Sequence, residues 1–174
     1  MLLYLNPSLE VTSLFINGTT SLYEREKQVI GVPARLSPGD SLLLELSYKG
    51  QIDERICYLN VPDAEIADTR ERMYLACRLG KRYSYLRKDF TLLIPEVLWY
   101  PTTVPPENPG SPYDNSRDFT RYSLRVRNYG KNKVISQGMR MKKGDQLVFR
   151  NESPLPGLTL NIGDYVTRQL IVDS

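Results

Sequence analysis

Few side chains in this sequence have the type and spacing that catalysis or metal binding requires. Two close pairs of carboxylates, Asp63 with Glu65 and Asp114 with Asp118, have the chemistry to act as acid and base or to hold a hard cation. Neither pair has a third ligand at a fixed spacing, so we interpret them as solvated loop charges. The carboxylates therefore predict no metal site.

The chain contains no histidine. Ser-His-Asp and Cys-His nucleophile pairs and the two-histidine zinc helix all depend on this residue. Glycine-rich phosphate loops of the P-loop and GxGxxG types are also missing from the sequence. We therefore expect no catalytic residue, no metal and no cofactor in this chain, and no enzymatic activity of its own.

The sequence does not fix the compartment. Cys57 and Cys77 allow one disulfide, but their spacing matches no zinc motif and a buried free thiol is the commoner state. No apolar window is long enough to span a membrane, and the opening residues lack the basic start and cleavage site of a signal peptide. The chain is expected to be soluble as given, and its parent could be anchored in a membrane.

Composition predicts one ordinary globular domain. The chain has 174 residues, of which 41% are hydrophobic and 25% charged, and its formal net charge is +3. The longest purely basic run is Lys142-Lys143, far short of the clusters that bind nucleic acid. A basic and tyrosine-containing stretch at 70–88 is partly cancelled by acidic residues, so a solvated face or a contact with a neighbouring domain is expected there.

The aromatic residues and two Asn-x-Ser/Thr patterns each have two readings. Twelve tyrosines and Trp99 could form a sugar-binding platform, but the tyrosines alternate into strand faces, which favours a role in the core. Asn17-Gly18-Thr19 and Asn151-Glu152-Ser153 match the glycosylation pattern. We interpret the first as a turn and the second as a strand end.

The elements that position these residues are predicted to be strands. In SLLLELSYKG, Leu44, Leu46 and Tyr48 alternate with polar residues, and FTRYSLRVRN (119–128) shows the same period of two. Similar runs lie at 8–16, 27–32, 55–61, 90–94, 133–138, 145–151, 158–163 and 165–172, with turn residues between them. About ten such strands predict an all-β fold, an antiparallel two-sheet sandwich or a saddle-like curved double sheet, with at most one short helix near 64–79.

Four ordered stretches carry a family resemblance over the whole chain. The family's features are a strand ending in Tyr-x-Gly, an aromatic-Pro step, an alternating strand followed by a Ser-containing turn, and a Gly-Asp-aromatic close. They correspond here to Tyr48 and Gly50, Trp99 to Pro101, Phe119 to Arg127 with Ile135 to Gly138, and Gly163 to Tyr165. In this order the chain resembles the amino-terminal, non-catalytic β domain of the gluzincin zinc aminopeptidases, of the aminopeptidase N and leukotriene-hydrolase type. It is most similar to the version in bacterial fusion proteins that combine an ABC-transporter permease with such a peptidase region.

The sequence departs from the family pattern at the aromatic-Pro step. Val97 stands where the family has Arg, and Thr102 and Val104 stand where it has Cys and Asp. The proline-rich segment from 101 to 118 is also longer than in the family. The family's contacts between this loop and the catalytic domain therefore do not transfer directly.

The resemblance implies a single β domain over 1–174 that is a fragment of a longer protein. Its partner would be a catalytic peptidase domain of the same polypeptide, which would carry the zinc, and the parent could include a membrane permease region. The family supplies from this domain one polar side chain that helps to hold the substrate's free amino group. Ungapped placement puts Leu92 there, so Glu96, the nearest carboxylate, is our candidate substitute.

Trp99 and Tyr100 are our candidates for the domain interface, and we predict that both are anchored, with the prolines that follow stiffening an ordered cover. Two other functions stay open at this point. One is an extracytoplasmic β-sandwich that binds carbohydrate or a protein partner through Trp99 and nearby tyrosines. The other is a structural spacer next to a permease.

Overall fold

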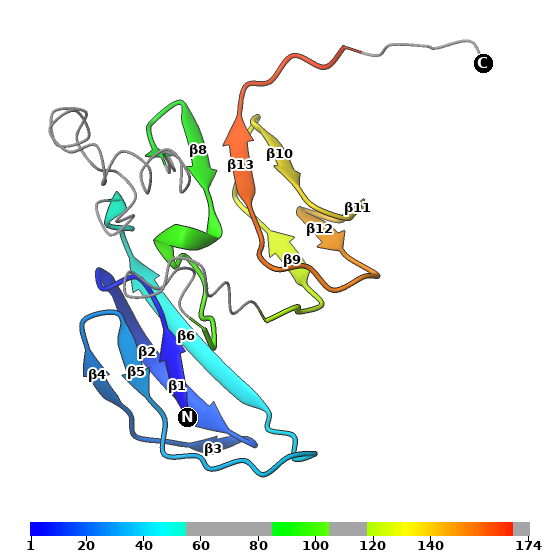
Figure 1. Cartoon of the computed structure of the whole chain (residues 1–174). Coiled ribbons are helices and arrows are strands. Elements are labelled where there is room, and N and C mark those ends of the chain that lie inside the picture. Colours follow the sequence, from blue (N-terminus) through cyan, green and yellow to red (C-terminus); the bar gives the residue numbers. More distant parts are fainter. Residues whose placement is uncertain (55–84, 105–117, 169–174) are drawn as a thin grey trace, which may run out of the picture.

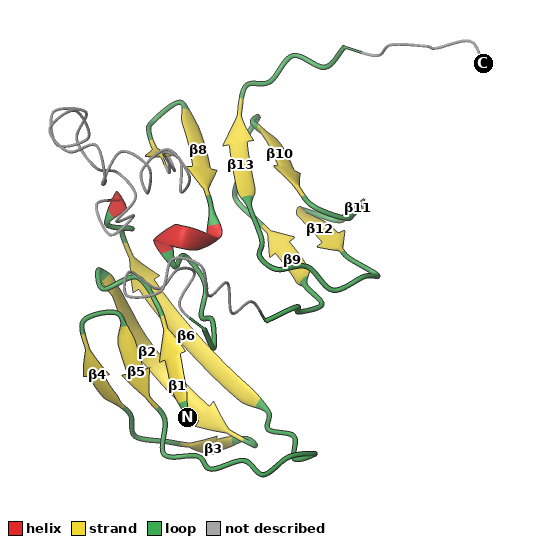
Figure 2. Cartoon of the chain, in the orientation of Figure 1, coloured by secondary structure: helices red, strands yellow, loops and turns green. Residues whose placement is uncertain are grey.

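The computed structural model describes residues 1–54, 85–104 and 118–168. Within these ranges the chain forms thirteen strands, arranged in four small sheets in which every pair of neighbours is antiparallel (Figures 1 and 2). The predicted all-β, antiparallel fold is confirmed. The predicted helix near 64–79, the predicted strand at 55–61 and both cysteines lie outside the described residues.

Two sheets make up the amino-terminal part, which we call the N-terminal pair. One has the order β1-β5-β4 and the other β3-β2-β6. The strands are β1 Leu2–Tyr4, β2 Leu9–Ile16, β3 Thr19–Thr20, β4 Glu24–Glu26, β5 Val29–Gly31 and β6 Leu44–Gly50. Between the two sheets lies a core of buried apolar residues, namely Leu3, Leu5, Leu9, Val11, Leu14, Ile30 and Val32.

The predicted alternation of β6 is confirmed. Leu44, Leu46 and Tyr48 are half-buried and pack against this core, whereas the residues between them are exposed. Strands β2 and β3 are joined by the two-residue turn Asn17-Gly18, in which φ is +50° and +81°. Two positive φ values define the turn type that suits the twist of a hairpin, so the turn predicted for the first Asn-x-Thr pattern is confirmed.

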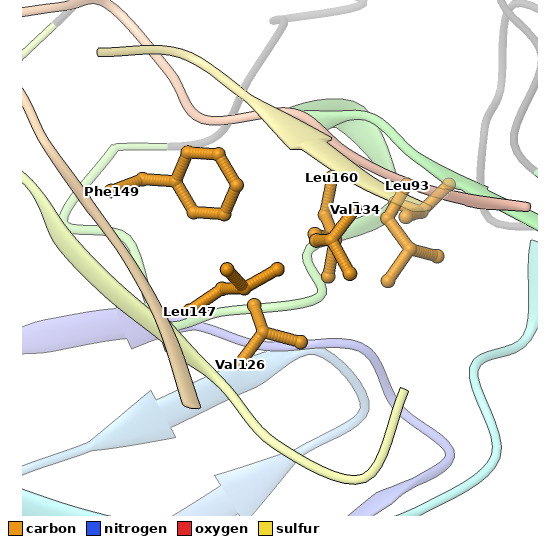
Figure 3. Close-up of a cluster of buried hydrophobic side chains, with 7 residues drawn as sticks. Leu93, Val126, Val134, Leu147, Phe149 and Leu160 are labelled. Carbon is orange, nitrogen blue, oxygen red and sulfur yellow. The ribbon is translucent and has the colours of Figure 1, made fainter. Parts of the chain in front are cut away.

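The other two sheets form the C-terminal pair. One has the order β10-β13-β8-β7 and the other β11-β12-β9. The strands are β7 Tyr85–Leu86, β8 Phe90–Leu93, β9 Ser123–Val126, β10 Lys133–Ser136, β11 Met139–Lys143, β12 Gln146–Arg150 and β13 Leu160–Gly163. Figure 3 shows their shared core, which consists of Leu93, Val97, Val126, Val134, Leu147, Phe149 and Leu160.

Two further predicted strands can be compared with the structure. The alternation predicted for 119–128 is confirmed in β9, whereas the strand predicted at 165–172 is wrong over its described residues. Leu124 and Val126 face the core while Ser123 and Arg125 are exposed. Residues 165–168, predicted as the start of a strand, have no strand structure. After Gly163 the chain continues without regular structure. The ring of Tyr165 lies 3.3 Å from the position that a Cβ on Gly163 would occupy, and Val166 is 84% exposed.

The two pairs of sheets lie side by side and are joined by a few buried groups (Figure 1). The side chain of Ile52, just after β6, packs against both cores. Asn6, between β1 and β2, is fully buried and bonds to the backbone of both parts, as described below. The 3-10 turn η2, Pro95–Val97, lies between the two pairs (Figure 2).

Candidate functional site

The segment that contains the three candidate residues begins with a short turn whose geometry follows from its sequence. Ile94 is extended, as the residue before a proline must be, and Pro95 opens η2 at a position where its missing N–H costs nothing. The turn closes with Leu98 N donating to Pro95 O at 2.9 Å, and Leu98 has a φ of +55°. This left-handed residue, itself buried, redirects the chain so that Trp99 and Tyr100 leave the turn toward neighbouring strands.

Trp99 is anchored through both its side chain and its backbone. Its indole Nε1 donates to Leu158 O at 3.1 Å, and its carbonyl oxygen accepts a hydrogen bond from the Tyr48 hydroxyl at 3.1 Å. The half-buried ring packs against the core of the C-terminal pair. Because the polar end of the indole is already bonded within the protein, Trp99 serves as an anchor of the fold, as predicted.

Tyr100 is anchored at the same place. Its hydroxyl accepts a hydrogen bond from Leu158 N at 3.0 Å and lies 3.5 Å from the Tyr122 hydroxyl. Its ring meets those of Trp99 and Tyr122 edge-on, at centroid distances of 4.9 and 5.7 Å. Burial, followed by the hydrogen bond with Tyr122, raises the pKa of the Tyr100 hydroxyl well above its usual range, so this group stays neutral.

The backbone of Leu158, which bonds to Trp99 and Tyr100, lies close to η2 because residue 157 is a glycine. A Cβ on Gly157 would lie 2.5 Å from Cγ and 3.0 Å from Cβ of Pro95, so only glycine allows this approach. The neighbouring Leu158 is buried. The segment around 157–158 thus fits against η2 and the two aromatic residues, and the four parts form one rigid junction.

Both ends of the proline-rich segment are fixed in the structure. Tyr4 and Thr102 exchange backbone hydrogen bonds of 2.8 and 3.0 Å, and the Thr103 hydroxyl donates to the carboxylate of Asp118. Thr120 and Leu155 form a second isolated bridge. Residues 105–117, and with them the predicted proline-stiffened cover, lie outside the described residues.

Glu96 lies in the first turn of η2 and is half-buried. It is the second residue of η2 and stands three and four residues before Trp99 and Tyr100 in the chain. The structure therefore brings together all three predicted residues, Glu96, Trp99 and Tyr100. Leu92 lies apart from them on β8, where it pairs with Asn161 of β13.

Sequence reasoning missed the residue that connects this junction to the N-terminal pair. The Asn6 side-chain amide donates to Val97 O at 2.8 Å and to Asp53 O at 3.0 Å. Its Oδ1 accepts from Ser8 N at 3.1 Å and from Asp53 N at 3.0 Å. The backbone N–H of Asn6 also donates to Leu98 O at 2.9 Å. The only sequence signal was the pair Asn6-Pro7, which predicts a turn and not a buried residue that bonds to several segments.

Two further observations concern the described residues alone. No three of their Asp or Glu side chains gather where they could hold a metal ion. No helix among them is long and apolar enough to cross a membrane.

Comparison with known proteins gives a likeness in fold. No protein-family model matches the chain, and no curated protein matches it in sequence. Among solved structures, an M1 zinc metallopeptidase from Deinococcus radiodurans superposes with a TM-score of 0.59 at 16% identity. A mutant M1 zinc metallopeptidase from the same organism, bound to a Tyr-Ser-Ala substrate, gives 0.62 at 16% identity. A two-domain mutant bound to L-arginine also gives 0.62.

These matches are strongly asymmetric in length. Each covers 94% of this chain but 34% of the metallopeptidase chain. The chain therefore has the fold of about one third of these enzymes, along nearly its whole length.

Proposed function

We propose that this chain is the non-catalytic amino-terminal β domain of an aminopeptidase-like zinc metallopeptidase, and that it packs beside a catalytic domain of the same polypeptide. The observation that carries the proposal is the asymmetric match, in which 94% of this chain superposes on 34% of M1 zinc metallopeptidases. A fold that spans one third of an enzyme is expected of one of its domains, and the role of that domain has to be argued from its side chains.

The side chains of this domain are consistent with a supporting role. Without histidine the chain cannot supply the two-histidine zinc helix, so the zinc and the reacting groups belong to the neighbouring domain. What this chain offers is a rigid junction of Trp99, Tyr100 and η2 that carries the carboxylate of Glu96. In this proposal the junction forms part of the interface with the catalytic domain, and Glu96 helps to hold the positively charged amino group of a peptide substrate.

The parent polypeptide in this proposal also contains a membrane permease region. That element is supported by the sequence resemblance alone. Sequencing the coding region on both sides of this chain tests both parts of the proposal. We expect a two-histidine zinc helix downstream and transmembrane segments upstream. A reading frame without a peptidase region would overturn the proposed function, and one without transmembrane segments would remove the permease from it.

Activity assays provide the biochemical test. The chain alone should show no turnover of aminoacyl substrates, with or without added zinc, whereas the complete parent protein should show metal-dependent turnover. In that protein Glu96→Gln should raise KM for substrates with a free amino group about tenfold or more, because a charged partner is lost. Glu10→Gln, whose carboxylate forms an exposed pair with Lys49, is the control and should leave KM unchanged. Zinc-dependent turnover by the isolated chain would contradict the assignment.

A further inference from the structure

The outer face of the β11-β12-β9 sheet carries a concentration of positive charge. Cross-strand register places Arg150 of β12 in a row with Ser123 and Met139, and Arg125 of β9 in the next row with Val148 and Met141. Lys143 follows opposite Gln146. We define the basic face as Arg125, Lys143 and Arg150, together with Arg121 and Arg127 on either side of β9. All five side chains are exposed.

Nothing in the described residues neutralises this face. The three strands contain no Asp or Glu, and none of the five cations is in an ion pair within the described part of the chain. Residues 118–168 hold ten Lys or Arg against four Asp or Glu, a formal charge of +6, whereas residues 1–54 hold four against seven, a formal charge of −3. The modest net charge of the whole chain therefore hides a separation of charge between the two pairs of sheets.

Protection of a sheet edge explains only some of these cations. Lysine and arginine on an edge strand discourage pairing with another chain. Because β11 and β9 are the two edge strands, this accounts for Lys143 and Arg125 of the basic face. It also accounts for Arg140 and Lys142 on β11, which lie on the opposite side of the sheet. It does not account for Arg150, because β12 is the central strand. The cation on the central strand calls for a different explanation.

The composition of the face indicates the chemistry of what it binds. At its centre Val148 is 2% exposed and Met141 half-buried, while Met139 at the edge is 61% exposed. Arginine and methionine are enriched at protein interfaces, and the arginine fork matches a carboxylate in two parallel hydrogen bonds. The strand positions of this face carry no aromatic ring, which a single-stranded nucleic acid would use for stacking and a membrane surface for insertion.

We propose that the basic face is a docking surface for an acidic patch of a protein partner, in which Arg125 and Arg150 pair with carboxylates and the exposed Met139, opposite Arg150, makes an apolar contact. This inference goes beyond the proposed function and does not depend on it. The basic face lies on the β11-β12-β9 sheet, whereas Glu96 lies in the turn η2, and the face would bind an acidic partner whether or not the parent is a peptidase.

The test uses the whole chain and labelled poly-L-glutamate as a probe of carboxylate recognition, with binding followed by fluorescence anisotropy at low ionic strength. The variant Arg125→Glu/Arg150→Glu reverses two charges on the basic face. The control Arg140→Glu/Lys142→Glu makes the same change in net charge on the other side of the same sheet. We expect the first pair to weaken binding about tenfold or more and the control pair about twofold or less.

Three results would overturn the proposal. One is an equal loss in both variants, which would indicate binding by net charge alone. The others are tighter binding of phosphatidylserine-containing vesicles or of an oligo-dT strand than of poly-L-glutamate, which would indicate a membrane or nucleic-acid surface. If circular dichroism shows that the charge-reversed chain is unfolded, Arg125→Gln/Arg150→Gln and Arg140→Gln/Lys142→Gln provide the same comparison with smaller changes.

Discussion

Asn6 is fully buried, and its amide uses every hydrogen-bonding position it has. Two N–H groups donate to Val97 O and Asp53 O, and Oδ1 accepts from two backbone N–H groups. The three segments held in this way are distant in the sequence: the link between β1 and β2, the end of β6 and the turn η2. A short side chain thus satisfies backbone groups that burial would otherwise leave without partners.

Replacing Asn6 by alanine should destabilise the protein strongly. The partly buried backbone N–H groups of Asp53 and Ser8 would lose their acceptor, and the Val97 carbonyl would lose its donor in a buried hydrogen bond. Because each buried group left unpaired costs on the order of 1–3 kcal/mol, we expect a loss of about 2–4 kcal/mol in the free energy of unfolding. Urea denaturation of Asn6→Ala measures it.

The matched control for this substitution is Asn132→Ala, whose side chain makes no hydrogen bond within the described residues. It should change the free energy of unfolding by about 0.5 kcal/mol or less. Equal effects of the two substitutions would show that the amide of Asn6 contributes no more than a surface asparagine does.

Tyr100→Phe isolates the hydroxyl group from the ring. The substitution keeps the edge-on contacts but removes the acceptor of the Leu158 N–H, and we expect a loss of about 1–2 kcal/mol. Because burial raises the pKa of Tyr100 in the folded state, the unfolded chain releases this proton first, near its ordinary value of 10. The unfolded state then binds fewer protons, so stability should fall as the pH rises above about 10.

The fall in stability at high pH should be smaller in Tyr100→Phe than in the wild type. Comparing the free energy of unfolding of both proteins at about pH 8 and about pH 11 separates this contribution from that of the other tyrosines and lysines. Identical losses in the two proteins would mean that Tyr100 ionises as readily in the folded protein as in the unfolded one.

At the scale of single residues, the sequence predicted that Trp99 is held in place, but it did not predict that Asn6 bonds to several segments. Trp99 was predicted as an anchor because, in the family resemblance, the aromatic-Pro step Trp99 to Pro101 lies where the chain passes from one sheet to the next. Its partners were not predictable, because Leu158 contributes only backbone groups, and any residue type has those. Asn6 was missed for a similar reason, since its role depends on burial that only the assembled fold creates.

At the scale of the strands, those with one exposed and one buried face could be predicted from the sequence, whereas those formed by tertiary bonds or at a sheet edge could not. Strands β6 and β9 have one solvent-exposed and one buried face, so polar and apolar residues alternate in their sequences. Strand β4 is the charged triplet Glu24–Glu26, and it forms where Arg25 donates to the carbonyl oxygens of Asn6, Leu9 and Lys27. Strand β11 is a basic edge. Strand β4 has no apolar residue to alternate, and the apolar alternation of β11 is limited to Met139 and Met141, because tertiary bonds and edge position override local preference.

The fit of 157–158 against η2 leads to a prediction about a glycine. Gly157→Ala should cost about 1–3 kcal/mol, because its Cβ would lie within 3.0 Å of two carbon atoms of the Pro95 ring, which cannot move aside freely. Gly31→Ala is the control. Its Cβ would meet atoms no nearer than 3.7 Å, so the cost should be about 0.5 kcal/mol or less.

Thermal or urea unfolding of the two variants decides this point. Trp99 fluorescence provides a local probe in the same experiment, because displacement of Leu158 would weaken the bond to the indole N–H. A Gly157→Ala protein as stable as Gly31→Ala would show that the contact with Pro95 relaxes without cost.

At the scale of the whole molecule, the chain has two hydrophobic cores and a narrow link between them. Among the described residues the link includes Ile52, which touches both cores, and the bonds of Asn6. The hydrogen bond from the Tyr48 hydroxyl to Trp99 O and the backbone bridge between Tyr4 and Thr102 also belong to it. Composition predicted one domain, and nothing in the sequence pointed to two cores, because each apolar strand face looks the same wherever its partner lies. Whether the cores behave as one unit is a question about the strength of this link.

We predict that the wild-type chain unfolds as one cooperative unit. Breaking either core would expose the fully buried Asn6 and leave its backbone partners unpaired, so each part stabilises the other. In urea, Trp99 fluorescence, which reports on the C-terminal pair, and far-UV circular dichroism, which reports on all the strands, should give coincident transitions. In Asn6→Ala the transitions should separate, whereas in Asn132→Ala they should stay coincident. Two separate transitions in the wild type would show that the pairs of sheets are independent domains and that Asn6 only joins their surfaces.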